Sequence, residues 1–455
     1  MAPRSVPPAR RRAALAALLG VLLPASTQAA DLMAVYRAAQ AHDPQIRGAA
    51  FTLAATEARL PEARGALLPQ LVASGGQSQT QADSRFTNEP HLERDARSWN
   101  WALQLTQPVL RYDSYFQYKQ AAFVVDQARQ QFRVASQDLI VRTAQAYFAV
   151  NEAFGARDAA DAEVAALQEQ LSQARHGFER GTHAITEVDE TQARLGAAQA
   201  RRIASRSDLV NATSDLRRLT GVDYAALAGL DGAVRLPDPV PASREDWLAR
   251  ARNGSPGVLA QQSALAAARL EVDKARSGHL PTVDIVASVG ANASSHSLTT
   301  PDDYGTHIHQ RALGVQVSVP LFSGGAINAR VDQAQGALGK AQADLDGAAA
   351  SAESDAEHAF NAVESGLAQI DALAQGVASA ESALKGTRAG YDAGLRVNLD
   401  VLNAQHQLYE SRRDLLKARY ETLLQGLKLK AAVGDLQEHD LMVVNAWLQD
   451  AARTP

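Results

Sequence analysis

The chain has 455 residues, enough for two or three ordinary domains, and a formal charge of −5. It contains no cysteine, which excludes disulfides, thiol catalysis, zinc–thiolate centres and a lipidated N-terminal cysteine. The mildly acidic balance gives no reason to expect a nucleic-acid partner, and a composition rich in alanine and poor in aromatic residues favours closely packed helices.

Residues 1–29 have the layout of a cleavable secretory signal peptide. Basic residues precede an apolar run from Ala13 to Leu23, then come Pro24 and small residues that end at Ala29. The apolar run is too short to span a bilayer as a helix. Cleavage after Ala29 would remove four arginines and no acid, so the formal charge would change from −5 to −9. We therefore expect a mature chain that is secreted across one membrane. No later stretch predicts a membrane-spanning helix.

The hydrophobic period changes twice along the mature chain. Leu32 to Leu67 predicts a helix, which Pro69 ends. Between Pro69 and Pro108 the period becomes two, and the same change occurs between Pro281 and Pro320. The apolar positions of these alternating runs are Trp99, Trp101, Leu103, Leu105, Val283, Ile285, Val289, Leu313, Val315 and Val317. Each half of the chain therefore predicts a pair of strands.

These strands have two interpretations. Alternation over about ten residues fits a strand that crosses an outer membrane at a tilt, but a soluble sandwich strand alternates in the same way. Trp99 and Trp101 at one end of a strand, and the long polar loops 81–97 and 296–309, favour the membrane. Four strands are too few to close a barrel, and an open sheet edge cannot lie in lipid. If the strands are in a membrane, several chains must share one barrel.

Two proline-free tracts, 112–236 and 321–453, predict long coiled-coil helices. Their apolar residues recur every seven positions, as in Val363, Ile370, Val377, Leu384 and Tyr391. Six glycines inside the second tract indicate close packing or curvature: Gly336, Gly339, Gly347, Gly366, Gly376 and Gly386.

The two halves of the chain are one unit used twice. Pro44, Pro69 and Pro108 recur 212 positions later as Pro256, Pro281 and Pro320. We predict a first repeat at 30–236, with strands within 69–110 and a helical hairpin at 113–220. The second repeat spans 237–455, with strands within 281–322, a hairpin at 326–433 and a C-terminal segment at 434–455. The Gly- and Pro-rich stretch 223–244 predicts the crossing linker.

The hairpin tips carry related sequences, RHGFERGTHAITEVDETQ at 175–192 and RAGYDAGLRVNLDVLNAQ at 388–405. In each, an aromatic residue stands three positions before a glycine, Gly181 or Gly394, that predicts the turn.

The sequence shows no catalytic constellation. His307 and His309 beside Asp302 and Asp303 could bind a metal, but a solvated loop explains them better. The acids that begin with Glu187 suit the start of a helix, where they complement its dipole. We predict a protein that is not an enzyme, with no cofactor and no metal.

The chain resembles the TolC family of trimeric outer-membrane channel-tunnels. The resemblance rests on DLMAVYRAAQAHDP, on both strand pairs, on FERGTHAIT and on AGYDAGLRVNLDVLNAQHQLY. It implies a mixed α and β fold: a homotrimer whose chains give four strands each to a twelve-stranded outer-membrane β-barrel, continued by a long α-helical coiled-coil barrel across the periplasm. It also implies contact with outer-membrane lipid, a periplasmic adaptor (membrane fusion protein) and an inner-membrane ABC or RND transporter as partners.

The resemblance further implies a gate at the periplasmic mouth. The residues that would hold it closed are Tyr391, Arg396 and Arg419, facing Thr186 and Glu187. Asp400 would form an acidic selectivity ring, in which the second family acid is replaced by Asn403. The alternative for each position is a solvated polar group near a turn.

The predicted function is an outer-membrane export channel for type I protein secretion. The missing lipid cysteine is less typical of the drug-efflux branch, so a multidrug efflux outlet is the alternative. A soluble periplasmic coiled-coil scaffold is a third reading, from a different class.

Overall fold

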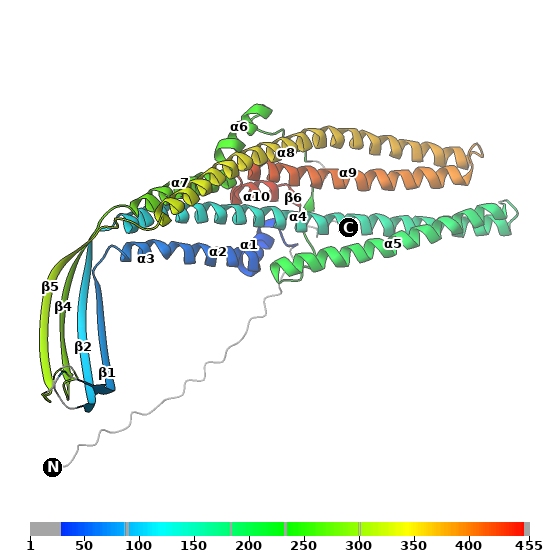
Figure 1. Cartoon of the computed structure of the whole chain (residues 1–455). Coiled ribbons are helices and arrows are strands. Elements are labelled where there is room, and N and C mark those ends of the chain that lie inside the picture. Colours follow the sequence, from blue (N-terminus) through cyan, green and yellow to red (C-terminus); the bar gives the residue numbers. More distant parts are fainter. Residues whose placement is uncertain are drawn as a thin grey trace, which may run out of the picture.

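The computed structural model describes residues 29–449, apart from 86, 88–90, 183, 232–233, 299 and 301. The predicted signal peptide therefore lies, except for its last residue, outside the described residues. The chain is elongated, with a curved sheet at one end and two helical hairpins at the other (Figure 1).

The sheet has four antiparallel strands in the order β1-β2-β4-β5. The strands are β1 (Gln70–Ser84), β2 (Leu92–Leu110), β4 (Thr282–Ser294) and β5 (Thr306–Ser318). The strand pairs from the two halves of the sequence join between β2 and β4. Pro108 lies near the end of β2, where the register with β4 shifts, because proline cannot donate to the ladder. Within the described chain, β1 and β5 each keep one unpaired edge.

One face of this sheet is apolar and the other is polar. Trp101 lies opposite Ala291, which in turn lies opposite His309, and residues directly opposite share a face. The apolar face thus carries Trp99, Trp101, Leu103, Leu105, Val289, Leu313, Val315 and Val317. Asn100, Gln104, Ser288 and Gln316 lie on the polar face. The predicted alternation is present in both strand pairs.

Two long helices run from the sheet, and two shorter helices return from the tips. The long ones are α4 (Tyr112–Glu179, 68 residues) and α8 (Ala326–Asp392, 67 residues). The returning ones are α5 (Ile185–Thr220, 36 residues) and α9 (Asn398–Ala432, 35 residues). None of the described helices has the combination of length and apolar character that crossing a membrane requires.

Shorter helices pack along the half of α4 and α8 nearer the sheet. They are α2 (Pro44–Glu57), α3 (Arg59–Gly65), α6 (Arg244–Gly254) and α7 (Pro256–Ser277). The prediction of one helix from Leu32 to Leu67 is wrong, because α1 (Leu32–His42) ends before α2 begins. Pro44 forces the preceding residue out of the helical region, and Asp43 has an extended backbone with ψ 122°.

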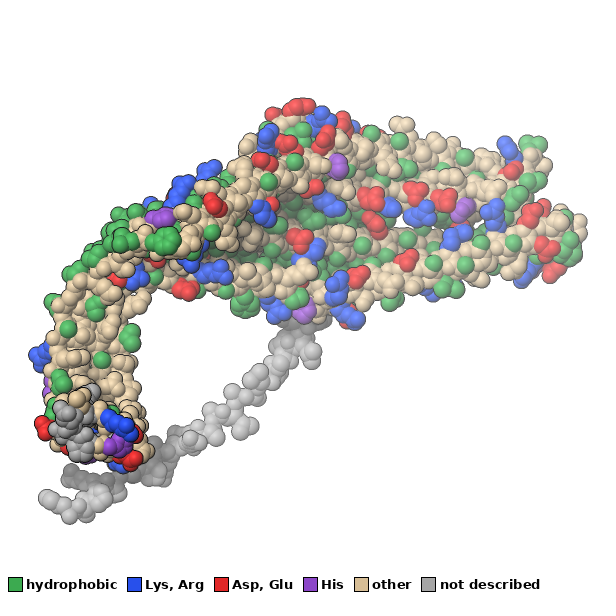
Figure 2. Space-filling view, viewed as in Figure 1, with side chains coloured by type: hydrophobic (Ala, Val, Ile, Leu, Met, Phe, Trp, Pro, Cys, Tyr) green, Lys and Arg blue, Asp and Glu red, His purple; other side chains and the backbone are tan. Residues whose placement is uncertain are grey.

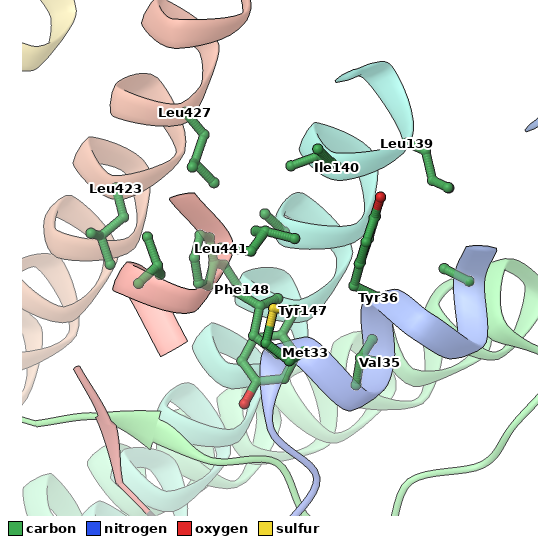
Figure 3. Packing of buried hydrophobic residues seen from close by; sticks show 14 of the residues in the cluster. Met33, Val35, Tyr36, Leu139, Ile140, Tyr147, Phe148, Leu423, Leu427 and Leu441 are labelled. Carbon is green, nitrogen blue, oxygen red and sulfur yellow. The ribbon is translucent and has the colours of Figure 1, made fainter. Parts of the chain in front are cut away.

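The main core lies about halfway along the helices, where α1, α4, α9 and α10 (Glu438–Asn445) meet (Figure 3). Tyr147 is fully buried there, and its hydroxyl donates to the Ala228 carbonyl oxygen at 2.7 Å. The linker also forms β3 (Gly229–Leu230), which pairs with β6 (Leu448–Gln449). The core therefore joins the start of the described chain, the crossing linker and the C-terminal segment, a junction that the sequence did not predict.

The α8 glycines fall into two kinds. A Cβ at Gly366 would collide with Thr422 on α9, so this glycine allows close packing as predicted. At Gly336, Gly339, Gly347, Gly376 and Gly386 a Cβ would meet no described atom within 4 Å, so close packing within the chain does not explain these five.

Candidate functional site

Both hairpin tips are built by the same turn. Gly394 has φ 73° and donates its N–H to the Tyr391 carbonyl, while Leu395 N–H donates to Gly390. Gly181 also has φ 73°, and the N–H of Thr182 donates to Gly177. This is the Schellman pattern, which requires a left-handed residue after the helix and explains why both repeats keep glycine there.

Tyr391 and Glu187 lie close enough across the two tips of one chain for the carboxylate charge to act on the phenol. Tyr391 lies at the end of α8, and Glu187 lies in the first turn of α5. Partial burial raises the pKa of the Tyr391 hydroxyl, and the carboxylates of Glu187 and Asp392 raise it further. The phenol is therefore protonated at neutral pH and available as a donor to a carboxylate. Two of the predicted gate residues are thus brought together.

Arg396 and Asp400 form an ion pair at the start of α9, with 3.6 Å between Nη1 and Oδ2. Asp400 also lies in the first turn of the helix, where its charge complements the dipole. The Arg396 side chain is 62% exposed, so the pair is weak and can exchange partners. Thr186 is exposed beside Glu187 on α5.

Arg419 lies away from these five residues. It is on α9 roughly 35 Å from Arg396, at 1.5 Å per residue. There it lines a cavity of about 610 Å³ with Glu364 and Asp371 of α8. Its Nε is buried and has no hydrogen-bond partner in the described protomer. The structure therefore brings Thr186, Glu187, Tyr391, Arg396 and Asp400 to the tips, but not Arg419.

Asn403 has a partner that sequence reasoning missed. Arg194 of α5 donates from Nη2 to the Asn403 Oδ1 at 2.6 Å. Asn403 lies one helical turn beyond Asp400, so Arg194 brings a positive charge near the position of the predicted acidic ring. The pair could not be found from the sequence, because heptad spacing does not fix the register between α5 and α9.

A buried polar contact fixes that register nearby. Asn398 is 2% exposed; its Nδ2 donates to Thr191 Oγ1 at 3.0 Å, and its Oδ1 accepts from Gln170 Nε2 at 2.6 Å. These residues come from α9, α5 and α4. Because a buried amide without partners is costly, the contact specifies how the second hairpin lies on the first.

A second link lies further from the tips. Glu163 of α4 is 7% exposed and accepts from Arg201 of α5 at 2.6 Å. His406 of α9 places its Nδ1 3.3 Å from the same carboxylate and its Nε2 3.4 Å from Glu410. Three helices thus share one charged cluster.

The described residues offer no group of three or more metal-ligating side chains. His307 and His309 instead meet ring to ring, with centroids 4.7 Å apart.

Comparison with known proteins finds a matching family model and relatives that align over nearly the whole chain. The family model described as outer membrane efflux protein matches residues 35–222 and 247–435. The proteases secretion protein PrtF of Dickeya chrysanthemi is 34% identical over 97% of this chain and 96% of its own length. The outer membrane protein TolC of Escherichia coli strain K12 is 33% identical over 94% of this chain and 87% of its own length.

Solved structures share the fold. The Campylobacter jejuni CmeC outer membrane channel superposes with a TM-score of 0.78 and 16% identity over 93% of this chain and 90% of that one. The VceC outer membrane protein of Vibrio cholerae gives 0.74 and 18% over 89% and 96%. At these identities the likeness supports the fold alone.

The family match and the full-length relatives, together with the shared fold, identify an outer-membrane channel subunit. The chain belongs to the outer membrane efflux protein family, the family of TolC. The predicted fold class, outer-membrane location and absence of enzymatic activity are confirmed, since the family consists of outer-membrane channels, which are not enzymes. The soluble scaffold interpretation is therefore wrong.

Proposed function

We propose that three copies of this chain form one export channel. The observation that carries the proposal is a four-stranded sheet with one apolar face and two unpaired edges, β1 and β5. Unpaired backbone groups are costly in lipid, so each β5 needs a β1 from another copy. Three chains with four strands each would close a barrel of twelve. The helical hairpins would continue this barrel as a tunnel into the periplasm.

The channel would complete a route that begins at the inner membrane. An ABC or RND transporter would drive the cargo, and a periplasmic adaptor would join the transporter to the hairpin tips. The tips suit such docking because they lie at the end of the molecule furthest from the sheet (Figure 1).

Type I protein secretion is the leading function. PrtF is named as a proteases secretion protein, and the alkaline protease secretion protein AprF of Pseudomonas aeruginosa is 33% identical over 94% of this chain. A drug-efflux outlet is the second candidate, because the outer membrane efflux protein BepC of Brucella suis is 27% identical over 69% of this chain.

Complementation separates the two functions. A host that lacks its own outer-membrane channel would receive this chain with the transporter and adaptor of a protease secretion system. We expect protease in the culture medium and little change in resistance to dyes and detergents. Restored resistance without secreted protease would contradict the secretion function and favour efflux.

The tip residues would form the gate of this channel. Glu187, Tyr391, Arg396 and Asp400 carry charges or donors at the mouth, and Thr186 adds a hydroxyl beside Glu187. In a trimer each weak contact occurs three times, so small energies add up to bias one mouth between a closed and an open state. Arg419 would act further up the tunnel, through a partner from outside its own protomer.

The double variant Arg396→Ser with Tyr391→Phe tests the gate. Loss of about 2 kcal/mol summed over three protomers would raise the open population roughly thirtyfold. We expect a larger and more stable single-channel conductance in planar bilayers. Arg330→Ser, at an exposed position on α8 near the sheet, is the matched control. If the double variant conducts as the parent does, these residues are not the gate.

A further inference from the structure

The apolar face of the sheet changes to a basic surface toward the loops. Near the helices it carries Val317, Val315 and Leu313, which are 59%, 67% and 80% exposed. Continuing along the same face of β5, the next residues are Arg311, His309 and His307, all exposed. Charged and histidine side chains gather at the loop end of the sheet, while its middle shows few (Figure 2).

The neighbouring strand β2 shows the same change on the same face. Trp101 and Trp99, 43% and 42% exposed, are followed by exposed Arg97. The rings of Trp99 and His307 lie 5.5 Å apart, across the small Ala293 of β4 that separates them. We call Arg97, His307, His309 and Arg311 the basic belt. It borders the two tryptophans directly.

The belt begins near the outer boundary of a membrane with Arg311, which is level with Leu103, and extends six residues further toward the loops to Arg97. The distance from Val319, the residue just after β5, to Arg311 is roughly 26 Å along the strand direction. At a tilt of about 40° that is about 20 Å along the membrane normal, close to the apolar band of about 25 Å in such barrels. An arginine there can extend its guanidinium to the interface, where tryptophans also concentrate.

In the part of the chain that the structure describes, neither the Arg97 nor the Arg311 guanidinium has an ion-pair partner. The acids of this face, Asp83, Glu93 and Asp95, lie further toward the loops, and two of them already contact His91 and Gln79. Water can solvate such arginines, but at the interface they also lie within reach of the anionic groups of the membrane.

We propose that the basic belt binds the phosphate groups of the glycolipid that forms the outer leaflet of the outer membrane. Guanidinium groups bind phosphate oxygens through paired, charge-assisted hydrogen bonds. The tryptophans would pack against the sugar and the upper acyl chains. This inference rests on the proposed barrel, which would place three such belts around one channel.

Native mass spectrometry of the purified, delipidated channel tests the belt with bis-phosphorylated lipid A as the probe. The variant Arg97→Gln with Arg311→Gln removes the belt arginines, and Arg47→Gln with Arg330→Gln removes two exposed arginines elsewhere. We expect the belt variant to bind lipid A at least about tenfold more weakly, while the control binds as the parent does. Dephosphorylated lipid A should bind the parent no better than lipid A binds the belt variant.

Three outcomes would overturn the belt: equal lipid A binding by parent and belt variant, equal binding of the dephosphorylated lipid, or displacement of lipid A by equimolar inorganic phosphate. Failure of the proposed channel can be distinguished from failure of the basic belt. If the chain forms no heat-modifiable oligomer and shows no conductance, the proposed function is contradicted. If it forms a conducting oligomer that does not bind lipid A, only the basic belt is contradicted.

Discussion

Glu152 of α4 is a half-buried carboxylate beside Glu421 and Lys417 of α9. Burial and, to a smaller extent, the Glu421 charge raise its pKa, Lys417 lowers it, and the net result is a pKa of about 7. The folded chain therefore holds a proton that the unfolded chain loses near pH 4.5. By linkage, the contribution of Glu152 to the free energy of unfolding falls as pH rises from about 4.5 to about 7, and it is constant above pH 7.

Glu152→Gln removes this dependence. We expect the variant to be more stable than the parent above pH 7, by on the order of 2 kcal/mol, with the difference vanishing below pH 4.5. The measurement is the midpoint of heat-induced loss of helical circular dichroism in detergent, from pH 4.5 to pH 8. Glu169→Gln, at an exposed position on the same helix, is the control. A difference that grows toward low pH would refute the assignment.

Arg194 gives a second prediction at this scale. Its charge lies beside Asn403, one turn from Asp400, so it should offset part of the carboxylate field at the mouth. Arg194→Gln should increase cation preference roughly twofold, the effect of about 0.4 kcal/mol, and Asp400→Ala should decrease it. Reversal potentials in asymmetric KCl measure both changes, with Arg330→Gln as the control. Two shifts of the same sign would be inconsistent with this arrangement.

At the scale of elements, glycines on one helix should respond in opposite directions. Gly366→Ala places a methyl group against Thr422 and should cost about 1–3 kcal/mol. Gly376→Ala meets no described atom within 4 Å and should gain roughly 0.5–1 kcal/mol of helix propensity. Thermal midpoints by circular dichroism compare the two. Destabilisation by both would mean that another copy of the chain packs on Gly376.

Most of the helices and strands could be predicted from the sequence. Period-two runs predicted the strands, and the glycine turns predicted both tips, because these signals are local. The break at Asp43 was missed although Pro44 marks it, since the apolar spacing continues across it. β3 and β6 are two residues long each, too short to leave a pattern.

The candidate site at the hairpin tips could be predicted only in part, because contacts between helices leave no local signal in the sequence. Glu187, Tyr391, Arg396 and Asp400 were predicted through the resemblance of the two tip sequences to the TolC family. The partners Arg194, Thr191 and Gln170 come from other helices, and heptads that slide by one repeat look the same in sequence. Their register is set by buried contacts such as that of Asn398, which only the structure reveals.

At the scale of the whole molecule, the absence of cysteine allows a direct test of assembly. β1 and β5 are separated by two strands, roughly 14 Å, which no disulfide can bridge within one protomer. Ala73→Cys combined in turn with cysteine at Arg311, Leu313 or Val315 should therefore give covalent dimers and trimers at one of these registers. Electrophoresis on non-reducing gels measures the covalent dimers and trimers.

Ala73→Cys with Ala312→Cys is the matched control, because Ala312 lies on the opposite face of β5 and should not react. Monomer alone at every register would exclude a shared barrel.

Because the main core lies about halfway along the helices, a small rotation at the core moves the tip of each hairpin by a larger distance. Tyr147 is anchored there through Ala228, and from Tyr147 to Glu179 α4 continues for roughly 48 Å. A rotation of about 5° at this fulcrum moves the end of the arm by about 4 Å. Side chains at the far end can thus separate beyond bonding distance while the packing around Tyr147 stays almost unchanged.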